Sequence, residues 1–328
     1  MTMAVAIGIA GGTMVLASET EGAGFTDFNE SYTEYDRVMD LVDRGVIQGY
    51  GDGSFKPRES IYRRDTARMF QRALDLRSGN LQMPFGDVSP GAGFADAVIA
   101  TYGAEIFLGS TTGNFGPDDR LTREQMASVI ARAYGLQGTN DNVELSDLDQ
   151  SSPTHREDIE VLYQNEVTTG RADGSFAPKA DINRHEFAIM IARAESVVAD
   201  RGPRMLGGAV TLDDGSQIEG YTRPYAENTI TIDLSSYPGD MVLKGGVIEV
   251  THDGDLHFTN KPAGLDIPDR QTVEQGVNNL ALIDAISEEN VTLNLLRNMS
   301  GSGNITAKGT FTDRKGTETP IRIIVKLK

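Results

Sequence analysis

The sequence QGYGDGSFKP at residues 48–57 returns as LGSTTGNFGP at residues 108–117 and as TGRADGSFAP at residues 169–178. Phe55, Phe115 and Phe176 hold the same place in the three copies, 60 and 61 residues apart. Each copy carries glycines where a positive φ is inexpensive, and each ends in a proline that stops the extended segment. Three turns of one type at this spacing indicate a protein built from internal repeats.

Each turn lies between two stretches that have the periodicity of an amphipathic helix. In the first copy Val38, Leu41 and Val42 form an apolar face before the turn, and Met69 and Phe70 belong to a second face after it. Every block opens with an aspartate, and the three are Asp27, Asp87 and Asp147. A helix pair this short buries little apolar surface alone, so we expect the three copies to pack around a shared centre.

The second helix of each copy is expected to begin at a capping motif that is followed by an arginine. The three arginines are Arg63, Arg123 and Arg184. Thr122-x-x-Gln125 has the form of a capping box, and Asn183-x-x-Glu186 is close to it. A cation in the first helical turn costs about 0.3–1 kcal/mol, whereas an anion bound to free N–H groups and the guanidinium would reverse that cost. An internal salt bridge to the opening aspartates is the alternative interpretation.

These blocks resemble the surface-layer homology family in their opening Phe-x-Asp, their glycine-rich turn and the arginine at the second helix start. The resemblance places the repeats at residues 25–76, 85–136 and 145–196. It implies a pseudo-threefold domain whose grooves between repeats bind pyruvylated secondary cell-wall polysaccharide. The binding residues expected on this basis are Arg63, Arg123, Arg184, Gly49, Gly109, Gly170, Asp27, Asp87 and Asp147.

The function that this resemblance implies is non-covalent anchoring of a secreted surface-layer or other surface protein to a Gram-positive cell wall, without catalysis or a cofactor. Neighbouring surface-layer subunits would be further partners. The alternatives are a wall-anchored hydrolase, or an adhesin, with its activity in the C-terminal domain.

Two departures from the repeat pattern predict grooves that differ from one another. Tyr62 takes the place of a capping threonine in the first copy. In the second copy Ser110 and Thr112 stand where Tyr50 and Asp52 stand in the first. We therefore expect one groove to bind weakly or not at all.

The composition of the 328 residues narrows the function further. The absence of cysteine excludes disulfides, thiolate zinc sites and cysteine catalysis. A formal charge of −18 makes nucleic acid and anionic membranes poor partners. Residues 3–16 form an uncharged run that is too short to span a bilayer, so residues 1–24 are interpreted as a signal peptide, although no basic residue precedes the run. No other apolar stretch approaches membrane length.

After residue 203 the pattern changes to short alternating runs separated by turn signals, which predicts a β-rich domain at residues 204–328, with an immunoglobulin-like sandwich as the expected form. The fold class is thus multidomain α + β. The runs are residues 229–234, 241–250, 291–295, 304–311 and 321–327. We expect a helix or loop at residues 271–286, and a core strand at the last run. No motif of a serine hydrolase, phosphate loop or zinc protease is present, and His252 and His257 fit a hairpin better than a metal site.

Overall fold

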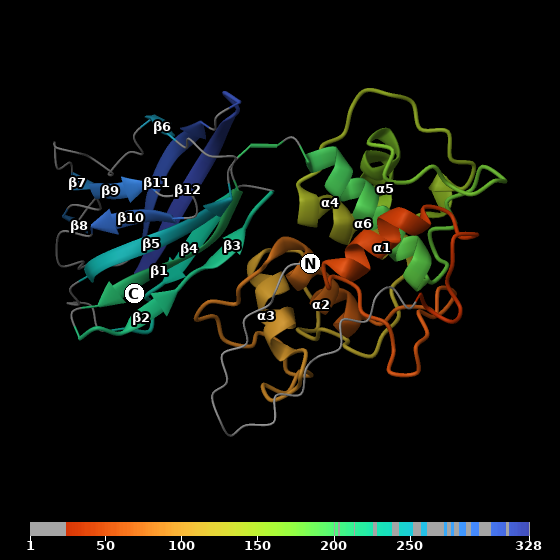
Figure 1. The fold of residues 1–328 in the computed structure, drawn as a ribbon, viewed down its shortest axis with the longest axis horizontal. Helices are drawn as coiled ribbons and strands as arrows, with labels where there is room; N and C mark the ends of the chain where they lie inside the picture. Colours follow the sequence, from red (N-terminus) through yellow and green to blue (C-terminus); the bar gives the residue numbers. More distant parts are fainter. Residues whose placement is uncertain are drawn as a thin grey trace, which may run out of the picture.

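The computed structural model describes residues 24–199, 201–202, 204–212, 214–225, 228–237 and 315–317, together with the strands given below. The predicted signal peptide lies almost entirely outside these residues. Figure 1 shows the helices gathered in one part of the molecule and the strands in another, with a short connection between α6 and β1.

Each repeat contributes one helix before its glycine-rich turn and one after it, as the periodicity predicts. The helices are α1 (Tyr35–Asp43), α2 (Arg63–Leu74), α3 (Ala95–Gly103), α4 (Arg123–Tyr134), α5 (Pro153–Gln164) and α6 (Arg184–Val198), with a short 3₁₀ helix η1 (Leu148–Gln150) before α5. Both predicted capping boxes are present, at the starts of α4 and α6, whereas Tyr62 gives α2 no side-chain cap.

The three repeats meet at a closed ring of main-chain hydrogen bonds. The amide of Ile61 donates to the carbonyl of Ile182 at 3.2 Å, Ile182 to Leu121 at 2.9 Å, and Leu121 back to Ile61 at 3.4 Å. All three side chains are buried, and the surrounding apolar side chains of the three repeats form one continuous core. Each repeat therefore satisfies buried main-chain groups of the other two, which gives the shared centre that the sequence predicts.

Tyr62 has a different role from the capping residues that stand at its position in the other repeats. Its ring lies between two guanidinium groups, with Arg120 at 3.6 Å and Arg64 at 4.5 Å from the ring centroid. Arg120 belongs to the second repeat, so this stack joins two repeats. The missing cap is thus accompanied by an added contact between repeats.

The C-terminal part forms two five-stranded sheets and one two-stranded sheet. The first has the order β2-β1-β5-β10-β9, the second has the order β3-β4-β12-β11-β6, and β7 pairs with β8. The strands are β1 (Arg204–Leu212), β2 (Gln217–Glu219), β3 (Tyr221–Arg223), β4 (Thr229–Asp233), β5 (Leu243–Thr251), β6 (His257–Asn260), β7 (Thr272–Val273), β8 (Val277–Asn278), β9 (Leu282–Ile286), β10 (Asn290–Asn294), β11 (Gly303–Thr312) and β12 (Glu318–Leu327).

The last strand lies in the middle of its sheet, parallel to β4 and antiparallel to β11. Its alternating residues Ile321, Ile323 and Val325 are buried, as the sequence pattern predicts for a core strand. The expectation of a helix or loop at residues 271–286 was wrong for the segments that the structure describes there, which are strands β7, β8 and β9. Main-chain pairing of β9 with β10 decides its conformation, and a single segment's periodicity does not report such pairing.

The sheets dock onto the second repeat at α3, which lies beside β3 (Figure 1). The glycines at this junction allow close approach: a Cβ on Gly103 would come within 2.7 Å of Leu81 and 3.0 Å of Tyr221. Arg223 adds an ion pair to Glu105 at 3.1 Å. Contact on two sides explains why α3 is buried around most of its circumference, unlike the amphipathic α1.

The ring predicts that the helical region opens as one unit. In native-state hydrogen exchange, the amides of Ile61, Leu121 and Ile182 should share a single opening free energy, because each link joins two repeats and all three links lie in one shared core. A markedly lower value for one of these amides would show instead that its repeat opens independently.

The junction yields a second prediction. Gly79 has a φ of +58°, and a Cβ there would lie 2.8 Å from main-chain atoms of Glu219 and Gly220. Gly79→Val should weaken docking by about 1–3 kcal/mol and speed tryptic cleavage after Arg201 in the connection, without loss of helical circular dichroism. Gly91→Val is the matched control, since its site is open. Equal cleavage rates for the two variants would contradict the docking contact.

Candidate functional site

The motif arginine of each repeat reaches across to the turn of the next one. Its Nε donates to the carbonyl of the turn phenylalanine, in the pairs Arg63 to Phe115 at 2.7 Å, Arg123 to Phe176 at 2.6 Å and Arg184 to Phe55 at 2.8 Å. The guanidinium carbon lies 4.8–5.0 Å from the centroid of the same phenylalanine ring. The three contacts close a cycle around the domain, so each arginine is held at a boundary between repeats.

The helix N–H groups beside these arginines are not free to bind an anion, which corrects the sequence-based reasoning. In α2 the amide of Arg63 donates to Asp119 O at 3.0 Å and that of Arg64 to Pro117 O at 3.2 Å. The starts of α4 and α6 are satisfied in the same way by carbonyls of the third and the first repeat. The neighbouring turn therefore takes the place of an anion at the helix dipole, and only the guanidinium can recruit a ligand.

The opening aspartates organise the turns and accept no hydrogen bond from the motif arginines. Each carboxylate accepts two main-chain N–H groups, from the turn phenylalanine and from the residue after it, at 2.7–2.9 Å. In the second repeat the donors to Asp87 are Phe115 and Gly116. Desolvation acts to raise the pKa of Asp87, but these two hydrogen bonds outweigh it and lower the pKa below its ordinary value. The same phenylalanine thus donates its amide to Asp87 and offers its carbonyl to Arg63.

The turn glycines provide room for the first residue of their own block. A Cβ would lie 2.2 Å from the ring of Phe25 at Gly49, 2.3 Å from Phe85 at Gly109, and 2.9 Å from Leu145 at Gly170. Gly109 and Gly170 also have a positive φ, of +76° and +73°. Packing and backbone conformation therefore explain these glycines without a ligand, although Gly109 also lines the groove described next.

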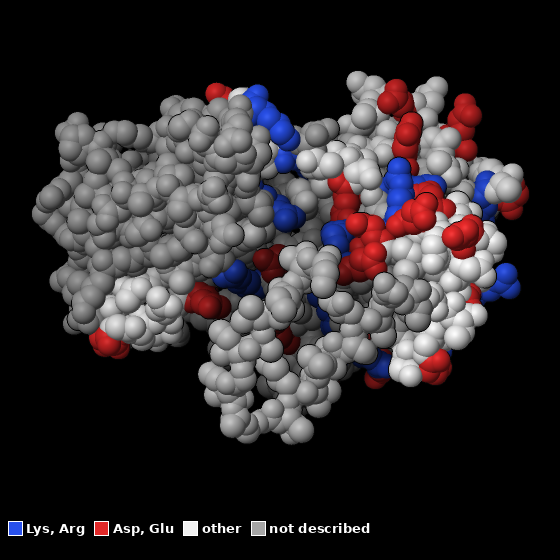
Figure 2. Space-filling view, viewed as in Figure 1, with Lys and Arg blue, Asp and Glu red and all other residues white. Residues whose placement is uncertain are grey.

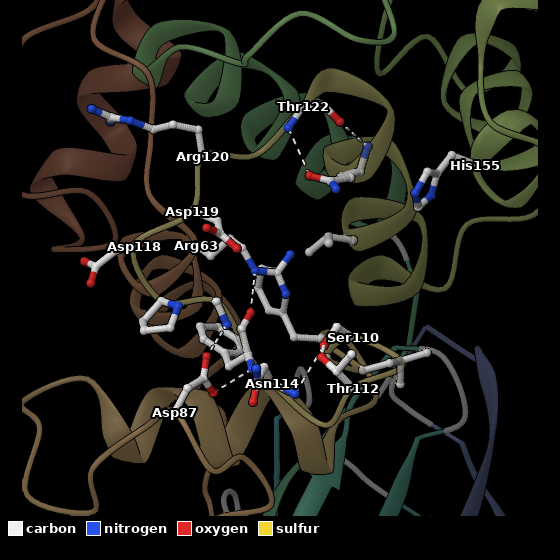
Figure 3. A pocket seen from close by; sticks show the side chains of 18 of the residues that line it. Arg63, Asp87, Ser110, Thr112, Asn114, Asp118, Asp119, Arg120, Thr122 and His155 are labelled. Carbon is white, nitrogen blue, oxygen red and sulfur yellow. Dashed lines mark hydrogen bonds between the residues drawn. The ribbon is translucent and has the colours of Figure 1, made fainter.

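A groove of about 1150 Å³ opens beside Arg63 (Figure 3). Its walls come from all three repeats: Arg63, the second turn, one side of α4 and the start of α5. Figure 3 shows Arg63 in the middle, with Asp119 beside it and Asp87 bonded to the turn. Desolvation lowers the pKa of Arg63, and the group stays charged because the ordinary pKa of an arginine lies far above neutral pH.

The motif arginines differ in how their terminal nitrogens are used. Arg123 Nη1 forms an ion pair with Glu186 at 2.8 Å. Arg184 Nη2 donates to Gln48 O at 2.9 Å, and its guanidinium stacks on Tyr50 at 4.9 Å. Among the residues that the structure describes, the terminal nitrogens of Arg63 have no hydrogen-bond partner. The three sites are thus unequal, in keeping with the departures seen in the sequence.

Two groove residues escaped the sequence reasoning. Arg132 lines the groove, nine residues after Arg123, and donates through Nε to Ile106 O at 3.1 Å. His155 stands at the other end (Figure 3), with Nδ1 2.7 Å from Ser128 Oγ, and burial lowers its pKa. An arginine recurs nine residues after every motif arginine, at Arg72, Arg132 and Arg193. That repetition was an available signal for Arg132.

Other chemistries find little support in the part of the chain that the structure describes. No cluster of three or more histidine and acidic side chains that could hold a metal occurs there. No helix there is long and apolar enough to cross a membrane. The side chains of His252 and His257 lie outside the described residues.

A family model described as S-layer homology domain matches residues 24–67, 84–127 and 144–188. Among curated proteins, the chain is 32% identical over 228 residues to the "Surface-layer 125 kDa protein" of Lysinibacillus sphaericus, covering 65% of this chain and 19% of that protein. It is 30% identical to an "Endoglucanase" of Bacillus sp. strain KSM-635, over 53% of this chain and 19% of the enzyme. An "S-layer protein" of Bacillus licheniformis is 28% identical, over 54% and 20%. The aligned part spans about a fifth of each relative.

The aspartate contacts lead to a stability prediction. Asp87→Ala leaves the amides of Phe115 and Gly116 without an acceptor, and should lower the free energy of unfolding by about 1–2 kcal/mol. Asp87→Asn retains one acceptor oxygen and should cost less. Chemical denaturation of the three proteins at neutral pH measures both effects.

The same contacts set a pH dependence. Because the folded-state pKa of Asp87 lies below its ordinary value of 3.8, the ionised carboxylate stabilises the fold above that pH. The stability difference between wild type and Asp87→Asn should be complete at pH 5–7 and disappear as the pH falls from about 4 to about 2. A difference that persists at the acidic end would mean that the negative charge is not what stabilises the turn.

Proposed function

Because its helical region contains three S-layer homology domains, we propose that this protein is secreted and held at the cell surface by non-covalent binding of these domains to a cell-wall polymer. The polymer is a pyruvylated secondary cell-wall polysaccharide, and it binds in a groove between repeats. The observation that carries this proposal is Arg63, a cation fixed through Nε whose terminal nitrogens line a large groove without a protein acceptor among the described residues.

A pyruvyl ketal is a suitable ligand for such a cation. It places a carboxylate on an otherwise neutral sugar, and a guanidinium can bind a carboxylate through two parallel N–H groups. The groove of about 1150 Å³ exceeds the roughly 300–1,000 Å³ of typical small-molecule sites, so it has room for more than one sugar. The chain's charge of −18 opposes long-range approach of an anionic polymer, so affinity depends on the contacts within the groove.

The proposal for residues 204–328 is a non-catalytic domain that acts as a spacer or as a contact to neighbouring surface-layer subunits, with its two larger sheets packed face to face as a sandwich. Support for the sandwich comes from buried residues on both sheets, such as Met205 and Val210 on β1 and Ile230 and Ile232 on β4. Support for a spacer comes from docking on α3, which fixes the domain's orientation relative to the wall-binding repeats. The endoglucanase relative aligns through the repeats, so it gives this domain no assigned activity.

Co-sedimentation with purified cell-wall sacculi tests the function. The full chain should sediment with polymer-bearing sacculi, and binding should be lost when the polymer is stripped or when only its pyruvyl groups are removed. Replacing Arg63, Arg123 and Arg184 together by alanine should abolish sedimentation. Because this change also removes the three Nε bonds that join the repeats, its result counts only if helical circular dichroism and thermal unfolding show that the variant is folded. Equal sedimentation of the wild type on intact and stripped sacculi would refute wall-polymer binding.

A further inference from the structure

The three repeats place the same arginine in different electrostatic surroundings. The position to compare is the third residue of each second helix, considered with the motif arginine of the preceding repeat. The pairs are Gln125 with Arg63, Glu186 with Arg123 and Asp65 with Arg184. Glu186 illustrates the consequence, since its Oε2 accepts the Asn183 amide of the cap while its Oε1 accepts Arg123 Nη1 at 2.8 Å. One carboxylate thus serves both the helix cap and the arginine.

Gln125 can serve the cap but not the arginine. Its Oε1 accepts the amide of Thr122 at 3.1 Å, which leaves an NH₂ group that donates hydrogen bonds. Gln125 and Arg63 line the same groove, so an amide stands there at the position that the carboxylate of Glu186 occupies beside Arg123. The negative charges of Asp119 and Asp87 partly offset the desolvation that lowers the pKa of Arg63, yet neither carboxylate accepts a hydrogen bond from its guanidinium, and Asp87 is already engaged by two amides.

The arginine nine residues after the motif arginine also differs in whether it is paired with a carboxylate. Arg193, nine residues after Arg184, donates to the carboxylate of Glu34 through Nε at 2.8 Å and again through Nη2. Arg132 donates to the carbonyl of Ile106, as Arg193 does to that of Val167. It forms no ion pair with any described residue, and the charge of Asp158 acts on it only at a distance. Arg132 is also close enough to Arg63 to lower the pKa of that group. Two cations therefore line one cavity with their terminal nitrogens unpaired.

Groups of the protein itself occupy the other two motif arginines. Arg123 forms an ion pair with Glu186, and the exposed Arg171 places a further positive charge near it. Arg184 has the Gln48 carbonyl on one nitrogen and the Tyr50 ring over its face. Ser110 stands in the place of Tyr50 in the second repeat, so no tyrosine ring covers Arg63. Its guanidinium lies 5.1 Å from the centroid of Phe107 instead, and the residue remains partly exposed.

We propose that the groove at Arg63 is the anion-binding groove of this chain, and that Arg132 is a second ligand-binding residue within it. Arg63 takes the carboxylate of an acidic glycan, and Arg132 takes a further oxygen of the same chain, from a hydroxyl or a second carboxylate. An anionic ligand relieves the repulsion between the two guanidinium groups and fills their open donor positions. This inference rests on the proposed wall-polymer binding and adds which groove and which residues perform it.

Gln125→Glu tests the groove without removing a structural contact. Glutamate keeps the capping box, as Glu186 does in α6, and brings to Arg63 the carboxylate that Arg123 already has. This variant should bind pyruvylated sacculi about tenfold or more weakly than the wild type, at unchanged thermal stability. The reverse exchange, Glu186→Gln, frees Arg123 and should leave binding undiminished or strengthen it.

Arg132→Gln and Arg193→Gln form a matched pair for the second residue. Both lose a hydrogen bond to a main-chain carbonyl, to Ile106 and Val167 respectively, but only Arg132 lines the open groove. Arg193→Gln also loses the ion pair with Glu34, so it is the more severe structural change of the two. Arg132→Gln should weaken binding several-fold while Arg193→Gln does not. Wild-type affinity in both Gln125→Glu and Arg132→Gln would overturn the inference while leaving wall binding intact. Failure of the wild-type protein to bind pyruvylated sacculi would refute the proposed function itself.

Discussion

The hydrogen bond from an arginine Nε to a phenylalanine carbonyl of the next repeat, made three times in a closed cycle, is the interaction on which this domain depends. A cycle has no terminal repeat, so every turn has a partner and every second helix begins against a neighbour. The main-chain ring of Ile61, Leu121 and Ile182 repeats the same closure on the axis. Removing one repeat would leave buried carbonyls and amides of the other two unsatisfied, which is costly for a small helical unit.

This closure also explains how an arginine can stand in the first turn of a helix. The unfavourable dipole interaction is small, about 0.3–1 kcal/mol, and a charge-assisted hydrogen bond to a carbonyl contributes more than that. The aspartate of the neighbouring block fixes the carbonyl by binding the amide of the same phenylalanine. One side chain consequently belongs both to the contact between repeats and to the groove, because the Nε bond that joins the repeats also fixes Arg63 in the groove wall.

The sequence was sufficient to predict the repeats, the helix pairs and both capping boxes, because glycine-rich turns and helical periodicity are local signals. It could not predict that main-chain groups of another repeat occupy the helix starts, since carbonyls carry no signature in the sequence. For the same reason the sequence could not show that the aspartates hold the turns and that the turn glycines make room for neighbouring side chains, although Asp87 and Gly109 also line the groove. The burial of α3 around most of its circumference could not be predicted either, because it depends on contact with β3, which is far away in the sequence.

A domain closed by main-chain contacts permits its grooves to diverge. The ring and the helix-start bonds use amides and carbonyls, so they place few demands on the side chains at the third helical residue or the third turn residue. Both positions differ among the repeats: Gln125 stands against Glu186, and Ser110 against Tyr50. A difference there changes the charges and rings beside one arginine, while the cycle that holds the arginine stays the same. The placement of the arginine is therefore common to the three repeats, whereas its electrostatic surroundings are not.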